Sequence, residues 1–383
     1  MTTLNQETLD ELIKLRKHIH ANPELSEKER ETAKLIKNYL EKCSPSKLIT
    51  DVGGHGVIAI FDSGIDGKSV LFRADTDALP IQETNDFEHQ SKVKGVSHKC
   101  GHDGHTCALL GFAKILSKQP PKKGKAILLF QPAEEEGIGA KAVLNDGKFK
   151  SIEPDYVFAF HNLPGYPLNE IVIKNGPFTS AVKSIIIKFN GKTSHAAEPE
   201  KGINPALPIA DIIKECDTLS NNQPEREDFT LITPIHINMG EIAYGISAGY
   251  GELRLTIRTW SEQYMDDLSS KLIALIKSIS KKYNIDIDYN WTHEFSANEN
   301  HDHAFTIIKE SATKLSLQLT EREYPFKWGE DFGLFTQQFK GAMFGIGSGE
   351  ACPALHNPDY DFPDDILPNA IQLFHQISLS ALA

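Results

Sequence analysis

The sequence of 383 residues lacks several features, and each absence excludes a class of protein. No apolar run approaches the roughly 18 residues that a transmembrane helix needs, so we expect no membrane partner. The first fifteen residues have no basic segment followed by an apolar one, which argues against a secretory leader. The net charge of −12 leaves no excess of basic residues. Nucleic-acid binding is therefore not expected, because phosphates require a basic surface.

Cysteine is also scarce. An odd number of scattered cysteines is typical of reduced thiols and not of a disulfide framework, and here they are Cys43, Cys100, Cys107, Cys216 and Cys352. Together with the missing leader, this predicts a cytoplasmic protein. The length exceeds what one hydrophobic core usually supports, so we expect two domains.

The first part of the chain, residues 1–176, alternates β-type runs with helical segments, which indicates a three-layer α/β domain. Two helices are expected near its start. The second of them should begin at Ser26, because Glu29 three residues later completes a capping box. The clearest β-type runs cover residues 56–61, 69–73, 127–131 and 156–160.

The pattern changes after Gly176. Residues 177–290 read strand, helix, strand, strand, helix, strand, which is the ferredoxin-like βαββαβ arrangement. We expect this segment to be a domain inserted into the α/β domain, which would resume over residues 291–383.

Polar clusters follow the predicted strands of the first domain at the point where each strand ends. Asp75 and Asp77 follow one strand, three glutamates at 134–136 follow another, and His161 follows a third. A fourth cluster, residues 97–105, precedes a helix and contains Cys100 and His102. Ligands of open parallel sheets bind at the carboxyl ends of the strands, so these side chains predict a site.

The residue types in these clusters favour a metal site. Cysteine, histidine and carboxylates are ligands of zinc and similar ions. The adjacent carboxylates of Glu134, Glu135 and Glu136 would raise one another's pKa values unless a cation neutralised them. A carboxylate beside a metal-bound water can also serve as general base. The alternative is a solvated histidine-rich turn beside an exposed acidic turn.

Several motifs, in this order, resemble the amidohydrolase branch of the co-catalytic metallopeptidases, which includes hippurate hydrolases, bacterial aminoacylases and plant auxin-conjugate hydrolases. The resemblance runs nearly from end to end. It implies a three-layer zinc-peptidase-like catalytic domain with an inserted lid or dimerisation domain. The motifs that carry it are residues 15–20, 23–25, 72–81, 98–105, 130–135, 161–164, 194–197, 330–332 and 355–357.

The resemblance implies two divalent metal ions, manganese or zinc, with cobalt or nickel possible. His102 would stand where relatives without the cysteine have a bridging aspartate. Glu134 would be the general base, and Asp77 would orient a metal ligand. The two ions would lie about 3.5–4 Å apart and share one water. The implied ligands are Cys100, His102, Glu135, His161 and His356.

The resemblance also implies substrate-binding residues in the inserted domain. His195 would stabilise the oxyanion that forms on the substrate carbonyl, in relatives often across a dimer interface, so a homodimer is expected. Arg258 could clamp the substrate α-carboxylate. The alternative for Arg258 is a surface ion pair.

Two departures from the family pattern bear on specificity. Glu136 stands where relatives usually have glycine. Residues 245–249 (Gly-Ile-Ser-Ala-Gly) replace an Asn-Val-Ile-Pro-Asp segment whose asparagine lies near the substrate carboxylate. We therefore expect an altered preference among acyl amino acids.

The sequence thus predicts a metal-dependent amidohydrolase that cleaves small N-acyl amino acids, either hippurate-like or N-acetylated. One alternative is a dipeptidase or exopeptidase with the same metals, which would recognise a free α-amino group. The other is a metal-binding scaffold without catalysis.

Overall fold

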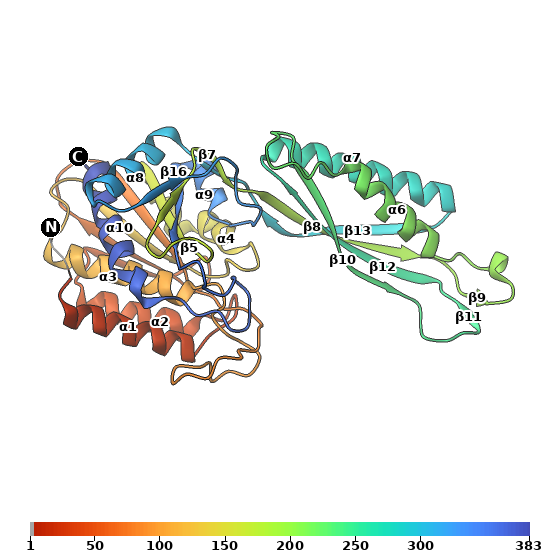
Figure 1. Cartoon of the computed structure of the whole chain (residues 1–383), viewed down its shortest axis with the longest axis horizontal. Coiled ribbons are helices and arrows are strands. Elements are labelled where there is room, and N and C mark those ends of the chain that lie inside the picture. The colour runs from red at the N-terminus through yellow and green to blue at the C-terminus, as the bar shows by residue number, and fades with distance from the viewer. Residues whose placement is uncertain (1–3) are drawn as a thin grey trace. The chain divides into compact units, whose positions relative to one another are not determined.

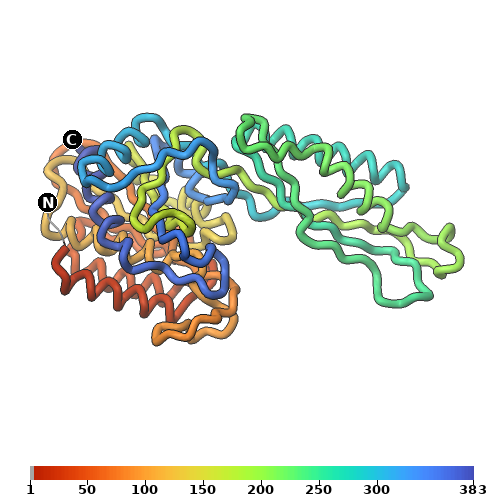
Figure 2. The backbone as a smooth tube through the Cα atoms, in the orientation of Figure 1, coloured from red at the N-terminus to blue at the C-terminus, as the bar shows by residue number. Residues whose placement is uncertain are grey.

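The computed structural model describes residues 4–383; residues 1–3, the start of the segment searched for a leader, lie outside the described residues. The chain forms two compact units. The first contains residues 4–178, Asn298–Glu323 and Asp331–Ala383, and the second contains Thr179–Ala297 and Tyr324–Glu330. Figure 2 follows the chain through the first unit, into the inserted residues and back. Among the described residues, no helix combines the length and the apolar character needed to cross a membrane.

The first unit is built on an eight-stranded sheet with the order β1-β2-β4-β3-β5-β16-β6-β15. Figure 1 labels β5 and β16 of this sheet. Its four central strands, β4, β3, β5 and β16, run parallel to one another, whereas β1 and β2 are antiparallel neighbours at one side. The strands cover Lys47–Val52 (β1), Gly56–Asp62 (β2), Ser69–Asp75 (β3), Lys125–Gln131 (β4), Tyr156–Leu163 (β5), Ile171–Ile173 (β6), Leu319–Glu321 (β15) and Lys340–Gly347 (β16).

Helices cover both faces of this sheet, which confirms the three-layer prediction. On one face Phe72 of β3 packs against Phe112, Phe158 and Phe374, with ring centroids 4.9, 5.8 and 5.2 Å away. The helices of this face are α1 (Gln6–Ala21), α2 (Arg30–Lys42), α3 (His102–Lys118), α8 (Asp302–Lys314) and α10 (Leu367–Ala381). The other face carries α4 (Gly139–Asn145), α5 (Gly147–Lys150) and α9 (Gly333–Gln338), and a short 3-10 helix, η2 (Asp364–Ile366), precedes α10.

The predicted start of the second helix at Ser26 is wrong. Helix α2 begins at Arg30, and the side chain of Glu29 caps no helical N–H. Instead, the Ser26 hydroxyl donates to Asp77 Oδ2 at 2.7 Å, and Glu29 Oε1 accepts from the backbone N–H of Ala133 at 2.8 Å. Both side chains form long-range contacts in place of the local cap.

The second unit has the ferredoxin-like arrangement that the sequence predicts. Its antiparallel sheet has the order β10-β12-β8-β13 and is accompanied by the helices α6 (Ala206–Leu219) and α7 (Glu262–Tyr283). The predicted boundary at 290 falls inside β13, which pairs with β8 as far as Phe295. The strands cover Ala181–Asn190 (β8), Thr230–Met239 (β10), Tyr250–Thr259 (β12) and Asp286–Phe295 (β13). The minor elements of the chain are β7 (Gly176–Thr179) paired with β14 (Asn298–Asn300), β9 (Ser194–His195) paired with β11 (Ile246–Ser247), and η1 (Pro199–Lys201).

Candidate metal centre

The polar clusters meet because the four central strands of the large sheet are parallel, so their carboxyl ends lie at one edge. Asp75 is the last residue of β3, and His161 lies in the second half of β5. The glutamates occupy the turn after β4, and His356 lies on the segment after β16. Helix α3 starts at His102 and places Cys100 and His102 at the same edge.

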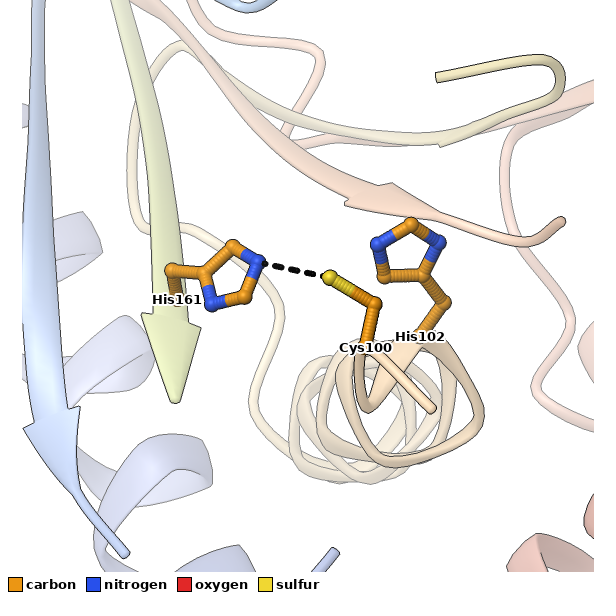
Figure 3. Close-up of side chains that lie close together, drawn as sticks. All are labelled: Cys100, His102 and His161. Atoms are coloured by element: carbon orange, nitrogen blue, oxygen red, sulfur yellow. Dashed lines mark hydrogen bonds between the residues drawn. The ribbon is translucent and has the colours of Figure 1, made fainter. Parts of the chain in front are cut away.

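The structure brings the five predicted ligands together. Cys100 Sγ lies 3.5 Å from His161 Nε2, with His102 beside them at the start of α3 (Figure 3). Glu135 lies between two histidines, with Oε1 3.7 Å from His102 Nε2 and Oε2 3.7 Å from His356 Nε2. Two sets of potential ligand atoms, each within 4.8 Å of one another, share Cys100; they are Cys100, His102 and His161, and Cys100, Glu135 and His356.

Two buried polar atoms indicate that this cluster fits metal ions. His102 Nε2 and Glu135 Oε1 face each other across 3.7 Å, and neither has a hydrogen-bond partner among residues 4–383. Buried polar atoms are normally paired, because an unpaired one costs about 1–3 kcal/mol. A cation between them would satisfy both. The sharing of Cys100 by two ligand sets fits a pair of ions.

The electrostatics of the cluster also favour a cation. Burial lowers the pKa of His102, but the carboxylates of Asp75, Asp77 and Glu135 outweigh burial and raise that pKa to about 10. Burial raises the pKa of Glu135 to about 8; His102 opposes this shift, and the neighbouring Asp77 and Asp75 reinforce it. The site therefore has an excess of negative potential that divalent ions would neutralise. Burial holds the pKa of His161 well below its usual range, which leaves a neutral imidazole suited to ligation.

Asp77 holds two of the predicted ligands in place. Its Oδ1 lies 3.2 Å from His102 Nδ1, and its main-chain carbonyl oxygen lies 3.0 Å from the same nitrogen. Its Oδ2 accepts from the N–H of Glu135 at 3.0 Å and from the Ser26 hydroxyl. Burial opposes ionisation of Asp77, but the contacts with His102 and Ser26 lower its pKa. These contacts orient the Nε2 atom of His102 towards Glu135.

Glu134, the predicted general base, is buried beside the ligands. Ala133, in a left-handed conformation with φ of 55°, turns the chain just before it. Glu134 Oε1 accepts from the N–H of Asp331 at 3.3 Å, and Oε2 lies 4.0 Å from His102 Nε2. The neighbouring Glu136, one of the departures from the family pattern, is exposed.

Asp75 contributes more than the sequence indicated. Its carboxylate lies 2.6 Å from His105 Nδ1 and accepts from Arg73 at 2.6 Å, and it also lies 3.6 Å from His102 Nε2. His105 is in turn 2.5 Å from the Asn162 side-chain oxygen. The feature of the sequence that could have indicated this role is the position of Asp75 at the end of a buried strand. His98, in contrast, has no hydrogen-bond partner for either ring nitrogen among the described residues.

His195 and Arg258 belong to the second unit. His195 lies on β9 opposite Ile246 of β11, so it pairs with the segment that departs from the family pattern. Its Nδ1 accepts from the N–H of Ala197 at 3.1 Å. Arg258 donates to the carbonyl oxygen of Lys327 at 2.7 Å, and burial lowers the pKa of its guanidinium group. Their roles towards substrate stay predictions.

Comparisons with known proteins agree with this geometry. The profile of peptidase family M20/M25/M40 matches residues 71–380. An N-acetyl-L-cysteine deacetylase from Bacillus subtilis (strain 168) is 34% identical over 97% of this chain and 89% of its own length. A hippurate hydrolase from Campylobacter jejuni is 31% identical over 97% of both chains.

A solved structure agrees as well. The crystal structure of a Bacillus subtilis protein described as a dinuclear metal binding peptidase from the M20 family superposes with a TM-score of 0.84. The two chains are 27% identical, and the match covers 99% of each. The chain therefore belongs to peptidase family M20/M25/M40 and is a metal-dependent hydrolase of amide bonds.

Proposed function

We propose that this chain cleaves the amide bond of small N-acyl amino acids with Glu134 as general base. The observation that carries the proposal is the position of Glu134. It is a buried carboxylate next to the ligand cluster, with one oxygen held by the N–H of Asp331 and the other 4.0 Å from His102 Nε2. A carboxylate in this place can take a proton from water and pass it to the leaving amine nitrogen.

Two divalent ions would be held by Cys100, His102, Glu135, His161 and His356. When bound, they supply polarisation of the substrate carbonyl and a water of lowered pKa. The thiolate of Cys100 favours zinc, and manganese is the alternative. Asp77 keeps His102 and Glu135 oriented for these ions through its two carboxylate oxygens.

Two residues of the second unit would bind the substrate. Because His195 Nδ1 accepts a backbone N–H, the neutral ring carries its proton on Nε2, where it can donate to the substrate carbonyl oxygen. Arg258 uses one guanidinium nitrogen for the Lys327 carbonyl, which leaves donors for a substrate carboxylate.

The names of the relatives and one departure from the family pattern support the proposed substrate class. The two relatives described above are named for N-acetyl-L-cysteine and hippurate. We infer an N-acetyl or hippurate-like substrate. The segment from Gly245 to Gly249 pairs with the His195 strand, so its altered sequence would change which acyl amino acid is preferred.

We also infer a homodimer formed through the second unit. Strand β10 is an edge of its sheet. The side chains of Ile235 and Ile237 on this strand are 60% and 52% exposed. In the following loop, Ile242 and Tyr244 are almost fully exposed. Such apolar side chains at a sheet edge support pairing with another chain. Sedimentation equilibrium tests this proposal, and a monomer at micromolar concentration would contradict it.

The test of the proposed function compares wild type with Glu134→Gln after chelation and refilling with manganese, zinc or cobalt. N-acetyl and N-benzoyl amino acids and dipeptides form the substrate panel. We expect kcat to fall by about 10²–10⁴-fold in the variant while two ions stay bound per chain. Glu88→Gln makes the same change of charge at an exposed site, so it is the control and should retain activity.

The outcomes separate the alternatives. If dipeptides are cleaved best, the chain is an exopeptidase. If wild type binds two ions and cleaves nothing on the panel, either the substrate lies outside the panel or the chain is a metal-binding scaffold without catalysis.

A further inference from the structure

His356 differs from the other predicted ligands in how it is held. It lies on an irregular segment between the end of β16 at Gly347 and the start of η2 at Asp364. Its backbone has a φ of 66°, a left-handed conformation that is uncommon outside glycine. Its side chain is 53% exposed, whereas Cys100, His102 and His161 are buried. Neither a helix nor a strand fixes this ligand, so other contacts must do so.

Lys99 supplies contacts to this segment from both its main chain and its side chain. Its carbonyl oxygen accepts from the N–H of His356 at 2.7 Å. Its ammonium group donates to the carbonyl oxygen of Tyr360 at 2.7 Å and forms an ion pair with the carboxylate of Glu83. Lys99 is fully buried. One residue thus holds the chain at His356 and again four residues later.

The ion pair of Lys99 is anchored in turn by the rest of the first unit. Glu83 lies 3.0 Å from His20 Nε2 and accepts from the N–H of Ser91 at 2.6 Å. His20 Nδ1 lies 3.0 Å from Asp103 of α3, which also pairs with Arg16 at 3.0 Å. The ammonium group is therefore tied through Glu83 and His20 to helices α1 and α3.

Packing alone does not explain this arrangement. Burial of an ion pair carries a desolvation cost that often equals its attraction, so apolar side chains in place of both Lys99 and Glu83 could fill the same space without loss of stability. A methionine would, however, lose the bond to the Tyr360 carbonyl. The charged group is therefore explained by what it orients.

We propose that Lys99 is a positioning residue that sets His356 for the ion that Cys100, Glu135 and His356 would hold. The proposal rests on the proposed metal centre. Lys99 directly precedes Cys100 in the chain, so the main-chain bond from the N–H of His356 to the Lys99 carbonyl ties two members of one ligand set together. The ammonium bond to the Tyr360 carbonyl, which a side-chain variant removes, holds the residues that follow His356. The other set, Cys100, His102 and His161, contains no residue of the His356 segment.

The test is calorimetric titration of zinc into the chelated full chain of wild type, Lys99→Met and Lys99→Arg. We expect two binding steps in wild type. In Lys99→Met the weaker step should lose about 10–100-fold in affinity, the usual effect of losing support behind a ligand, and the tighter step should change less than twofold. Lys99→Arg keeps the charge, so its affinity in the weaker step should lie between those of wild type and Lys99→Met. The exposed Lys94→Met is the matched control and should bind like wild type.

A double-mutant cycle with His356→Ala separates positioning from general destabilisation. If Lys99 acts through His356, Lys99→Met should not weaken the second step further in the His356→Ala background. The pair Glu83→Gln and Lys99→Met removes both charges, so it tests the same point if Lys99→Met alone does not fold.

Two results would overturn the proposal. One is wild-type affinity for both ions in Lys99→Met, and the other is an equal loss with and without His356. If wild type itself binds no second ion, the proposed metal centre fails, and the role of Lys99 fails with it.

Discussion

Replacement of Asp77 by asparagine tests how the metal ligands are held. Both oxygens of the Asp77 carboxylate accept hydrogen bonds, from His102 Nδ1 at 3.2 Å, from Ser26 at 2.7 Å and from the N–H of Glu135 at 3.0 Å. Asparagine has the same shape but only one accepting atom. The NH₂ end of its amide must therefore face one of these donors, and that hydrogen bond is lost. The least costly choice faces His102, which keeps the main-chain carbonyl of residue 77 at 3.0 Å.

The magnitude follows from the bond that is lost. A hydrogen bond to a charged group contributes about 1.5–3 kcal/mol, and each 1.36 kcal/mol corresponds to a factor of ten. We therefore expect Asp77→Asn to weaken metal binding by about 10–100-fold. The range agrees with the effect of removing a group behind a metal-ligating histidine. Ser26→Ala removes one neutral hydrogen-bond donor and should lower metal affinity by less than tenfold.

The assay measures zinc binding to protein from which a chelator has removed the metal. Binding is measured by calorimetry or by competition with a chromophoric chelator. Asp66→Asn changes the charge equally at an exposed site and serves as the control. Affinity within twofold of wild type in Asp77→Asn would refute the orienting role of Asp77. An equal loss in Asp66→Asn would show a general effect of charge and refute it as well.

Three further predictions concern the first unit. Burial opposes charge on His20, but its carboxylate partners raise its pKa to about 9 from 6.5. The contribution of charged His20 to the free energy of unfolding is therefore fully present below pH 6.5. That contribution, about 3 kcal/mol, is lost as pH rises through 9. Urea unfolding of the metal-free chain should show this loss in wild type and not in His20→Gln; equal pH profiles would contradict it. In Gly101→Ala, with φ of 95°, the new Cβ would lie 2.4 Å from Asn162 Oδ1, so zinc affinity should fall at least about tenfold. Gly95→Ala, also at positive φ but with nothing within 4 Å, should keep that affinity. Phe72→Ala should lower the unfolding free energy by about 3–5 kcal/mol in urea, and a loss below 1 kcal/mol would refute its place in the core.

The strands were predictable because they are buried on both faces. Residues 156–160 form a run that is apolar apart from its first tyrosine, which is typical of a central parallel strand between two layers of helices. The ferredoxin-like arrangement of the inserted segment was also predictable, because the period of its hydrophobic pattern changes clearly between strands and helices. The boundary at 290 was less predictable, because β13 continues with polar residues on its exposed side.

The start of α2 shows where a local pattern fails. Ser26 and Glu29 have the spacing of a capping box, but Asp77 and the N–H of Ala133 compete for the same side chains. These partners lie 51 and 104 residues away in the chain. No window of local sequence contains them.

The buried network around Lys99 was missed for the same reason. Charged residues usually lie at the protein surface and are rarely buried unless they are paired. The sequence therefore suggests surface positions for the members of this network, which are Arg16, His20, Glu83 and Lys99. The pairing becomes visible only when α1, residues 83–103 and the segment after β16 are placed side by side.

The sequence by itself determined the residue types of the site, their positions at the ends of strands and the family, because motifs and burial periods are local properties of the chain. Only the tertiary structure decided which of these residues meet. The ligands come from positions 100 to 356, and the parallel strands bring their carboxyl ends to one edge. Long-range contacts such as Asp77 with Glu135, or Lys99 with His356, then fix the ligands, and they depend on packing that no single segment encodes.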